Sequence, residues 1–109
     1  MNFEEYQKLS RRTALYPNKD NNFVYPTLGL SGEAGEVAEK IKKVLRDKNG
    51  VVDEATKNDL AKELGDVLWY VSQIATELGL SLDEIAKNNI AKLADRQKRN
   101  MLSGSGDER

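Results

Sequence analysis

The sequence predicts an all-α fold, a four-helix-type bundle that forms an oligomer. Apolar residues recur at spacings of three and four in the long segments, which is the period of a helix and excludes a strand. Two segments repeat one pattern, in which two acids enclose an apolar residue and a glycine, at 33–38 and again at 63–68. With 109 residues the chain forms one domain with a modest core, so burial between copies would help to stabilise the bundle.

The first helix is predicted near the start of the chain. Asn2 is a suitable N-cap, because Glu5 follows three residues later and apolar residues then recur at helical spacing. This helix should end before Pro17. Residues 16–26 contain both prolines of the chain and three asparagines, so we expect a loop there.

Three apolar residues near the end of this loop are open to two interpretations. The simpler one is that Phe23, Val24 and Tyr25 anchor the loop on the bundle. The alternative is that Phe23 or Tyr25 lines a pocket for a flat ring.

Two long helices carry the repeated pattern. The first should begin between Thr27 and Ser31 and end near Arg46, before a turn that contains Asn and Gly. Asp53 is a suitable N-cap for the second, which should end at Glu77, just before a glycine in the usual C-terminal position.

The last helix begins with a capping box, Ser81 with Glu84. Asn89 falls on its apolar face, where an unpaired amide costs about 1–3 kcal/mol, so we expect a partner in the bundle or on a ligand. Lys92 and Arg96 offer positive charge beside it, although each alone would be read as a solvated cation. Residues 1–101 should form the single domain and residues 102–109, which contain Ser-Gly-Ser-Gly, a disordered tail.

The repeated acids are the candidate metal ligands. Acids three residues apart lie about 60° apart around a helix, at the rim of the apolar stripe, so packing the two helices together would gather all four carboxylates. Any one of these acids alone would be interpreted as an exposed side chain on a helix. The repeat of the acidic pattern on two helices favours a cluster instead. Oxygen ligands without sulfur or imidazole suit Mg²⁺, with Mn²⁺ as a substitute. The four residues are Glu33, Glu36, Glu63 and Asp66.

Other residues of the repeats carry further expectations. Gly35 and Gly65 lie inside helices, where glycine costs about 1 kcal/mol relative to alanine, so they predict close helix packing. Tyr70 follows Asp66 by four residues and is either part of the acidic rim or a tyrosine at the edge of the core. Trp69 is expected on the far side of its helix from the acids, at an interface or in the core.

The composition excludes several classes of function. Without Cys or His the chain has no disulfides, no thiol nucleophile, no zinc site of the usual kind and no Ser-His-Asp triad. The 17 basic and 18 acidic side chains leave a formal net charge of −1, which gives no drive toward nucleic acid polymers or anionic membranes. No segment resembles a transmembrane helix or a signal peptide, so we expect a cytoplasmic protein.

Acidic metal ligands together with nearby cations favour a polyphosphate ligand. A triphosphate brings about four negative charges to a site that already holds four, so more than one Mg²⁺ is expected. The metals would activate a water molecule and hold the phosphates for attack.

The stretches GLSGEAGEV at 29–37 and ELGDVL at 63–68 resemble the MazG-type nucleoside triphosphate pyrophosphohydrolases, whose signature is Glu-x-x-Glu, a spacer and Glu-x-x-Asp. The resemblance extends from about Tyr25 to Arg99, because the last helix with its Asn-Ile-Ala-Lys-Leu stretch is also similar. One departure is Gly32, which stands where many members have a second acid.

This resemblance implies an enzyme of the all-α NTP pyrophosphatase kind. It would hydrolyse a nucleoside triphosphate, with a dNTP as the first candidate, to the monophosphate and pyrophosphate, using Mg²⁺ and acting as a homodimer or homotetramer. The four acids would bind metal, with Glu36 and Glu63 catalytic and Glu36 as the general base. The residues implied to contact the nucleotide are Tyr70, Asn89, Lys92 and Arg96.

Several alternatives stay open at this point. The relatives act on standard deoxynucleotides, dCTP or dUTP, damaged nucleotides or ppGpp, and the sequence does not choose among them. A different class is a non-catalytic helical oligomer that binds Mg²⁺ and nucleotide as a sensor or regulatory partner. A third is a plain bundle whose acids have no role.

Overall fold

A computed structural model describes residues 1–109 as four α-helices without a strand, so the predicted all-α fold is confirmed. The helices are α1 (Phe3–Arg11), α2 (Val24–Asp47), α3 (Glu54–Glu77) and α4 (Leu82–Lys98). No helix of the chain combines the length and the apolar character that a membrane crossing needs.

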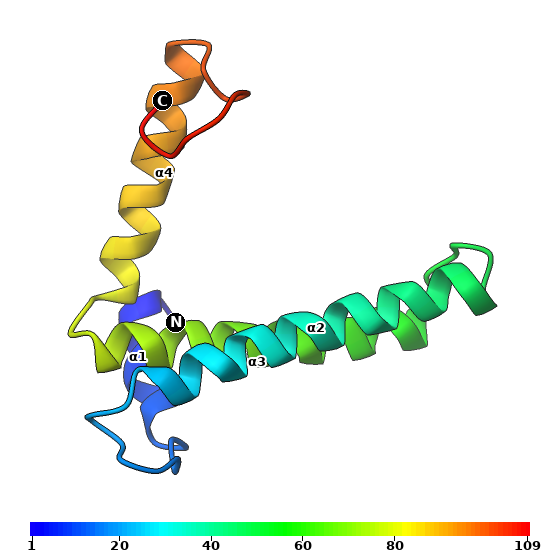
Figure 1. The fold of residues 1–109 in the computed structure, drawn as a ribbon, viewed down its shortest axis with the longest axis horizontal. Helices are drawn as coiled ribbons and strands as arrows, with labels where there is room; N and C mark the ends of the chain where they lie inside the picture. The colour runs from blue at the N-terminus through cyan, green and yellow to red at the C-terminus, as the bar shows by residue number, and fades with distance from the viewer.

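The two long helices, α2 and α3, lie side by side in opposite directions and form the rod of the molecule (Figure 1). The short α1 packs against one end of this rod, and α4 leaves from the same end at a steep angle. The repeated acid patterns therefore lie on neighbouring helices.

Three predicted N-caps are present. The side chains of Asn2, Asp53 and Ser81 each accept a hydrogen bond from the backbone N–H three residues later, at 2.9, 2.8 and 3.2 Å. Each satisfies one of the amide groups that a helix leaves unpaired at its start. The predicted end of α3 at Glu77 is also confirmed.

The predicted start of α2 is wrong. The helix begins at Val24, before the interval between Thr27 and Ser31, and the preceding loop is 12–23. Pro26 lies in the first helical turn, where the missing N–H has no intrahelical acceptor, so the proline is tolerated. Asn22 caps this start, because its Oδ1 accepts from the backbone N–H of Tyr25 at 3.0 Å.

The close packing predicted at two glycines is found at a third. No atom lies within 4 Å of the Cβ position of Gly35 or Gly65, so neither needs to be glycine within one chain. At Gly29, by contrast, a Cβ would fall 2.2 Å from Cε1 of Tyr70. The backbone of α2 at Gly29 is therefore in close contact with the Tyr70 ring of α3.

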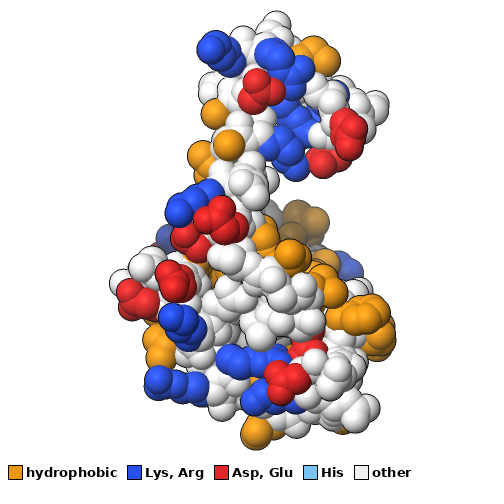
Figure 2. Space-filling model, turned by 90° about the vertical axis from the view of Figure 1, so that its left-hand side faces the viewer, with side chains coloured by type: hydrophobic (Ala, Val, Ile, Leu, Met, Phe, Trp, Pro, Cys, Tyr) orange, Lys and Arg blue, Asp and Glu red, His pale blue; other side chains and the backbone are white.

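A single chain leaves much apolar surface uncovered. Only ten of 109 residues are buried. The radius of gyration is 16.8 Å, whereas a compact chain of this length has about 13 Å. On α4, which extends from the rest of the molecule as a narrow projection (Figures 1 and 2), Ile90 is 67% exposed and Ile85 and Leu93 are each 40% exposed.

Residues 102–109 contain neither helix nor strand and fold back along α4. Lys92 Nζ lies 2.8 Å from the Asp107 carboxylate, and Arg96 donates to both the backbone and the side chain of Asp107. The disorder expected for this tail stays a prediction.

Candidate metal and ligand site

Three of the four predicted acids come together where α2 and α3 lie side by side. Glu33 of α2, with Glu63 and Asp66 of α3, can each place one carboxylate oxygen within 4.8 Å of the others. The antiparallel register of the two helices sets this grouping, because it puts the first acid of α2 beside both acids of α3. These three residues are called the carboxylate group below.

The electrostatics of the carboxylate group favour a cation. Partial burial, the Glu63 side chain and the negative charge of Asp66 together raise the pKa of the Glu33 carboxyl. Lys40 Nζ lies 3.9 Å from Glu63 Oε1, and one lysine cannot balance three carboxylates. The ligand atoms are all hard oxygens, so the residues present fit a divalent ion such as Mg²⁺.

Glu36 lies outside the carboxylate group. It follows Glu33 by about one turn of α2 and its side chain is exposed. The structure thus separates the fourth predicted ligand from the three that converge.

Beside the carboxylate group is a cleft lined mainly by aromatic side chains, called the aromatic cleft below. Its volume is about 300 Å³, at the lower end of the range for small-molecule sites. Trp69 and Tyr70 also line a smaller cavity of about 180 Å³ together with Glu33 and Asp66, so the two spaces share a wall. The cleft is lined by Thr13, Leu15, Tyr16, Pro17, Tyr25, Trp69 and Tyr70.

The placement predicted for Trp69 is wrong. An offset of three residues from Asp66 corresponds to about 60° around a helix, so Trp69 lies on the acidic side. Its Nε1 donates to the Ser10 carbonyl at 3.1 Å and to Thr13 Oγ1 at 3.0 Å, and its ring meets Tyr70 edge to face at 5.0 Å. Trp69 therefore joins α3 to the end of α1 and forms part of the cleft.

Tyr25 lines the cleft, as the alternative interpretation of the loop proposed, and its ring stacks on Tyr16 with centroids 5.1 Å apart. Phe23 and Val24 are each more than half exposed, so the interpretation that they anchor the loop is wrong. Tyr70 stands at the junction, where burial and then the neighbouring Tyr25, Glu33 and Asp66 raise its pKa.

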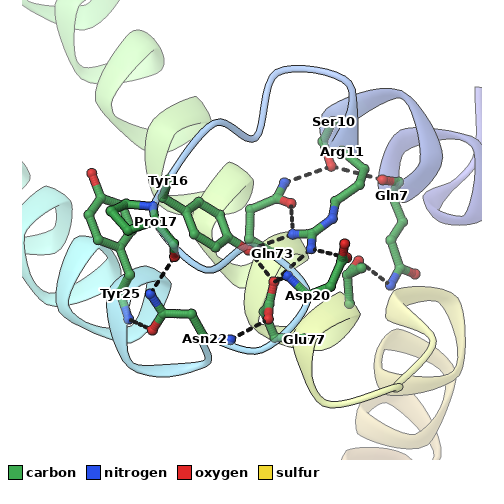
Figure 3. Close-up of polar contacts among 11 residues, drawn as sticks. Gln7, Ser10, Arg11, Tyr16, Pro17, Asp20, Asn22, Tyr25, Gln73 and Glu77 are labelled. Carbon is green, nitrogen blue, oxygen red and sulfur yellow. Dashed lines mark hydrogen bonds and ion pairs between the residues drawn. The ribbon is translucent and has the colours of Figure 1, made fainter.

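A polar network anchors the loop instead (Figure 3). The Glu77 side chain is 0% exposed and receives hydrogen bonds from Arg11 and the Tyr16 hydroxyl, both at 2.6 Å. Backbone N–H groups of Asp20 and Asn22 also donate to it, at 3.0 and 2.8 Å. Burial raises the pKa of Glu77, and these donors outweigh burial and lower it to about 2.

No pattern in the sequence predicts this network. Arg11 and Glu77 are 66 residues apart, and neither belongs to a motif. The nearest hint is the density of Asn and Asp in the loop, where Asn18 and Asp20 adopt positive φ values of 53° and 78°.

The cationic residues of α4 lie apart from the carboxylate group in the single chain. Asn89 is exposed, which removes the expected need for a buried partner. Lys92 and Arg96 instead pair with Asp107 of the tail. Figure 1 shows why, since α4 points away from the rod that carries the acids.

Comparisons with known proteins found one matching family model and a similar phage protein. A family model described as the MazG nucleotide pyrophosphohydrolase domain matches residues 26–101. The Gene 37 protein of Mycobacterium phage L5 is 44% identical over 114 aligned residues, which cover 100% of both chains. No solved structure gave a significant match.

Proposed function

The chain belongs to the MazG nucleotide pyrophosphohydrolase family, and from this premise we propose that it hydrolyses a nucleoside triphosphate to the monophosphate and pyrophosphate with Mg²⁺. The observation that carries the proposal is the carboxylate group next to an aromatic cleft. A metal site and a site for a flat ring side by side suit a nucleotide.

The aromatic cleft is the proposed site of the nucleobase. Every base has a flat π face, and stacking on an aromatic side chain contributes about 1–3 kcal/mol. Tyr25 and Trp69 offer such rings, and Tyr70 lines both the cleft and the cavity that holds Glu33 and Asp66. A base in the cleft would direct its phosphates toward Glu33 and Asp66.

Glu33, Glu63 and Asp66 are the proposed ligands of Mg²⁺. When bound, the ion would supply Lewis-acid stabilisation of the phosphate charge. Without a cation the carboxylates would repel the triphosphate, so the proposal requires metal for substrate binding as well as for turnover.

The proposed reaction is attack by water on the α-phosphorus. A bond forms between the water oxygen and this phosphorus, the bond from the α-phosphorus to the oxygen bridging to the β-phosphate breaks, and pyrophosphate leaves. A carboxylate accepts the proton of the attacking water. Glu36, exposed and about one turn from Glu33, is the proposed base, and Glu63 is the proposed catalytic residue that acts as a metal ligand.

A homodimer or homotetramer is proposed as the active form. Apolar residues exposed on α4 would be covered by a second chain. The proposed nucleotide contacts of Asn89, Lys92 and Arg96 require the same assembly, because α4 of one chain points away from its own acids. Tyr70 alone among the four nucleotide-binding candidates lies beside the carboxylate group.

The deciding experiment measures pyrophosphate release from the standard NTPs and dNTPs plus dUTP, with Mg²⁺, with Mn²⁺ and with EDTA. Metal-dependent release that leaves the nucleoside monophosphate supports the proposal and ranks the bases. Release of orthophosphate instead would contradict attack at the α-phosphorus. Nucleotide binding without turnover would support the non-catalytic alternative.

A further inference from the structure

The Glu77 carboxylate is fully enclosed, yet it takes no part in the carboxylate group. It follows Asp66 by 11 residues on α3, which is about 16 Å along the helix axis. A buried carboxylate is costly unless it is paired and hydrogen-bonded, so its partners indicate what it stabilises.

All the partners of Glu77 belong to α1 or to the loop 12–23. Oε2 accepts from the Tyr16 hydroxyl at 2.6 Å and from the backbone N–H of Asp20 at 3.0 Å, and Oε1 accepts from the N–H of Asn22 at 2.8 Å. Arg11 completes the set at 2.6 Å and also donates to the Asp20 carboxylate at 2.8 Å. One side chain of α3 therefore holds three points of the loop.

The loop depends on these contacts for its shape. Asp20 has a φ of 78° and Asn18 a φ of 53°, values that residues other than glycine rarely adopt. Such a conformation persists where surrounding contacts impose it. For Asp20 those contacts are its backbone hydrogen bond to Glu77 and its ion pair with Arg11.

The loop forms one wall of the aromatic cleft. Tyr16 is buried, with its hydroxyl held by Glu77 and its ring stacked on Tyr25 at an interplanar angle of 15°. Tyr25 is 43% exposed and faces the cleft. Tyr25, in the first turn of α2, thus packs its ring on Tyr16, and Glu77 holds the Tyr16 hydroxyl (Figure 3).

We propose that Glu77 is a positioning residue for nucleotide binding, whose buried carboxylate fixes Tyr16 and the loop so that Tyr25 presents its ring to the base. This inference rests on the proposed function, since it takes the aromatic cleft as the site of the base. It predicts that Glu77 controls affinity for the base and leaves metal and phosphate chemistry unchanged.

Two variants test this role. Glu77→Gln keeps the size of the side chain and removes its charge. Tyr16→Phe keeps the ring and removes only the hydroxyl that joins Glu77 to the aromatic pair. The matched control is Asp53→Ala, which removes the cap at the opposite end of α3 and destabilises the protein without touching the cleft.

Steady-state kinetics use the triphosphate that the intact protein hydrolyses fastest. Both test variants should raise KM about tenfold, within the range for loss of one base-stacking contact, and change kcat by less than about twofold. Asp53→Ala should leave KM unchanged. A merely structural role of Glu77 would lower the amount of active protein and leave KM as it is, which would overturn the proposal.

A binding measurement gives a second readout that does not need turnover. Trp69 is the only tryptophan of the chain and lines the cleft, so its fluorescence reports on the occupant. The probes are dAMP, dCMP, dGMP and dTMP, with pyrophosphate plus Mg²⁺ as a ligand without a base; pyrophosphate affinity is measured directly by isothermal titration calorimetry. Both variants should weaken monophosphate binding about tenfold and leave pyrophosphate binding unchanged.

The outcomes separate this inference from the proposed function. If the variants lose equal affinity for monophosphates and pyrophosphate, or lose affinity for neither, the positioning role of Glu77 is overturned. Turnover by the intact protein would still support the proposed enzymatic function. If the intact protein neither hydrolyses nor binds any nucleotide, both proposals fail. If Glu77→Gln does not fold, Tyr16→Phe alone decides, and an unchanged KM in it counts against the proposal.

Discussion

The ring of Tyr70 lies directly over the backbone of Gly29, so close that a methyl group at that glycine would stand 2.2 Å from Cε1 of the ring. Tyr70 in turn lines both the aromatic cleft and the cavity that contains Glu33 and Asp66. The absence of a side chain at Gly29 therefore allows Tyr70 to occupy its place between the two sites.

Gly29→Ala should impair nucleotide binding. Alanine inside a helix normally stabilises by about 1 kcal/mol relative to glycine, but here the added methyl group must displace the Tyr70 ring. We expect KM to rise about tenfold or more, measured by pyrophosphate release. Gly32→Ala is the control on the same helix, since no atom lies within 4 Å of that position, and it should stabilise slightly. An unchanged KM in Gly29→Ala would argue that Tyr70 has no role in the site.

Glu63→Gln should remove activity and leave the fold intact. The substitution keeps the shape of the side chain and removes one of three converging charges, so Mg²⁺ loses a ligand. Several kcal/mol of transition-state stabilisation correspond to about a 100-fold or larger loss of rate. Circular dichroism and gel filtration verify the fold, and Glu39→Gln, an exposed acid on α2, is the control. Retained turnover would exclude Glu63 from the mechanism.

Glu77 should make the protein sensitive to acid. Its pKa is lowered from 4.5 to about 2 in the folded chain, so its contribution to the free energy of unfolding is present above pH 4.5 and is lost as the pH falls through 2. At about 1.4 kcal/mol per pKa unit this amounts to about 3 kcal/mol. Measured by urea unfolding, the free energy of unfolding should be higher for the intact protein than for Glu77→Gln at pH 7, and this difference should shrink toward pH 2. Glu84→Gln, at an exposed position, should have the same free energy of unfolding as the intact protein at both pH values.

Ile90→Asp should weaken self-association. Ile90 is 67% exposed on α4, and covering an isoleucine contributes about 1.5–3 kcal/mol. Light scattering after gel filtration should find a dimer or tetramer for the intact protein and smaller species for this variant. Asn88→Asp adds the same charge to α4 without removing an apolar side chain, and it should assemble normally. A monomeric intact protein would refute the proposed assembly.

Local patterns predicted most of the secondary structure correctly. The caps at Asn2, Asp53 and Ser81 and the end of α3 at Glu77 each depend on residues within a few positions of one another. The start of α2 differs from the prediction because Pro26, which favours a loop in the sequence, is tolerated in the first turn of a helix.

Only part of the candidate site could be predicted from the sequence, because local patterns do not record how helices pack. The spacing of the acids places each pair at the rim of its helix, but it does not say which acids face the neighbouring helix. The packing of α2 on α3 brings Glu33 to Glu63 and Asp66 and leaves Glu36 outside. Trp69 lies on the acidic side of α3, which its offset of three residues from Asp66 is sufficient to predict.

Local sequence was enough to predict four amphipathic helices, the N-caps of three of them and the two acidic pairs, because each follows from side chains within a turn or two of the same helix. The tertiary structure alone decided that Tyr70 rests on Gly29 and that Glu77 fixes the loop through Tyr16 and Arg11. These contacts join residues some 40 to 66 positions apart, and such pairs are selected by the register and angle at which the helices pack, which no local pattern records.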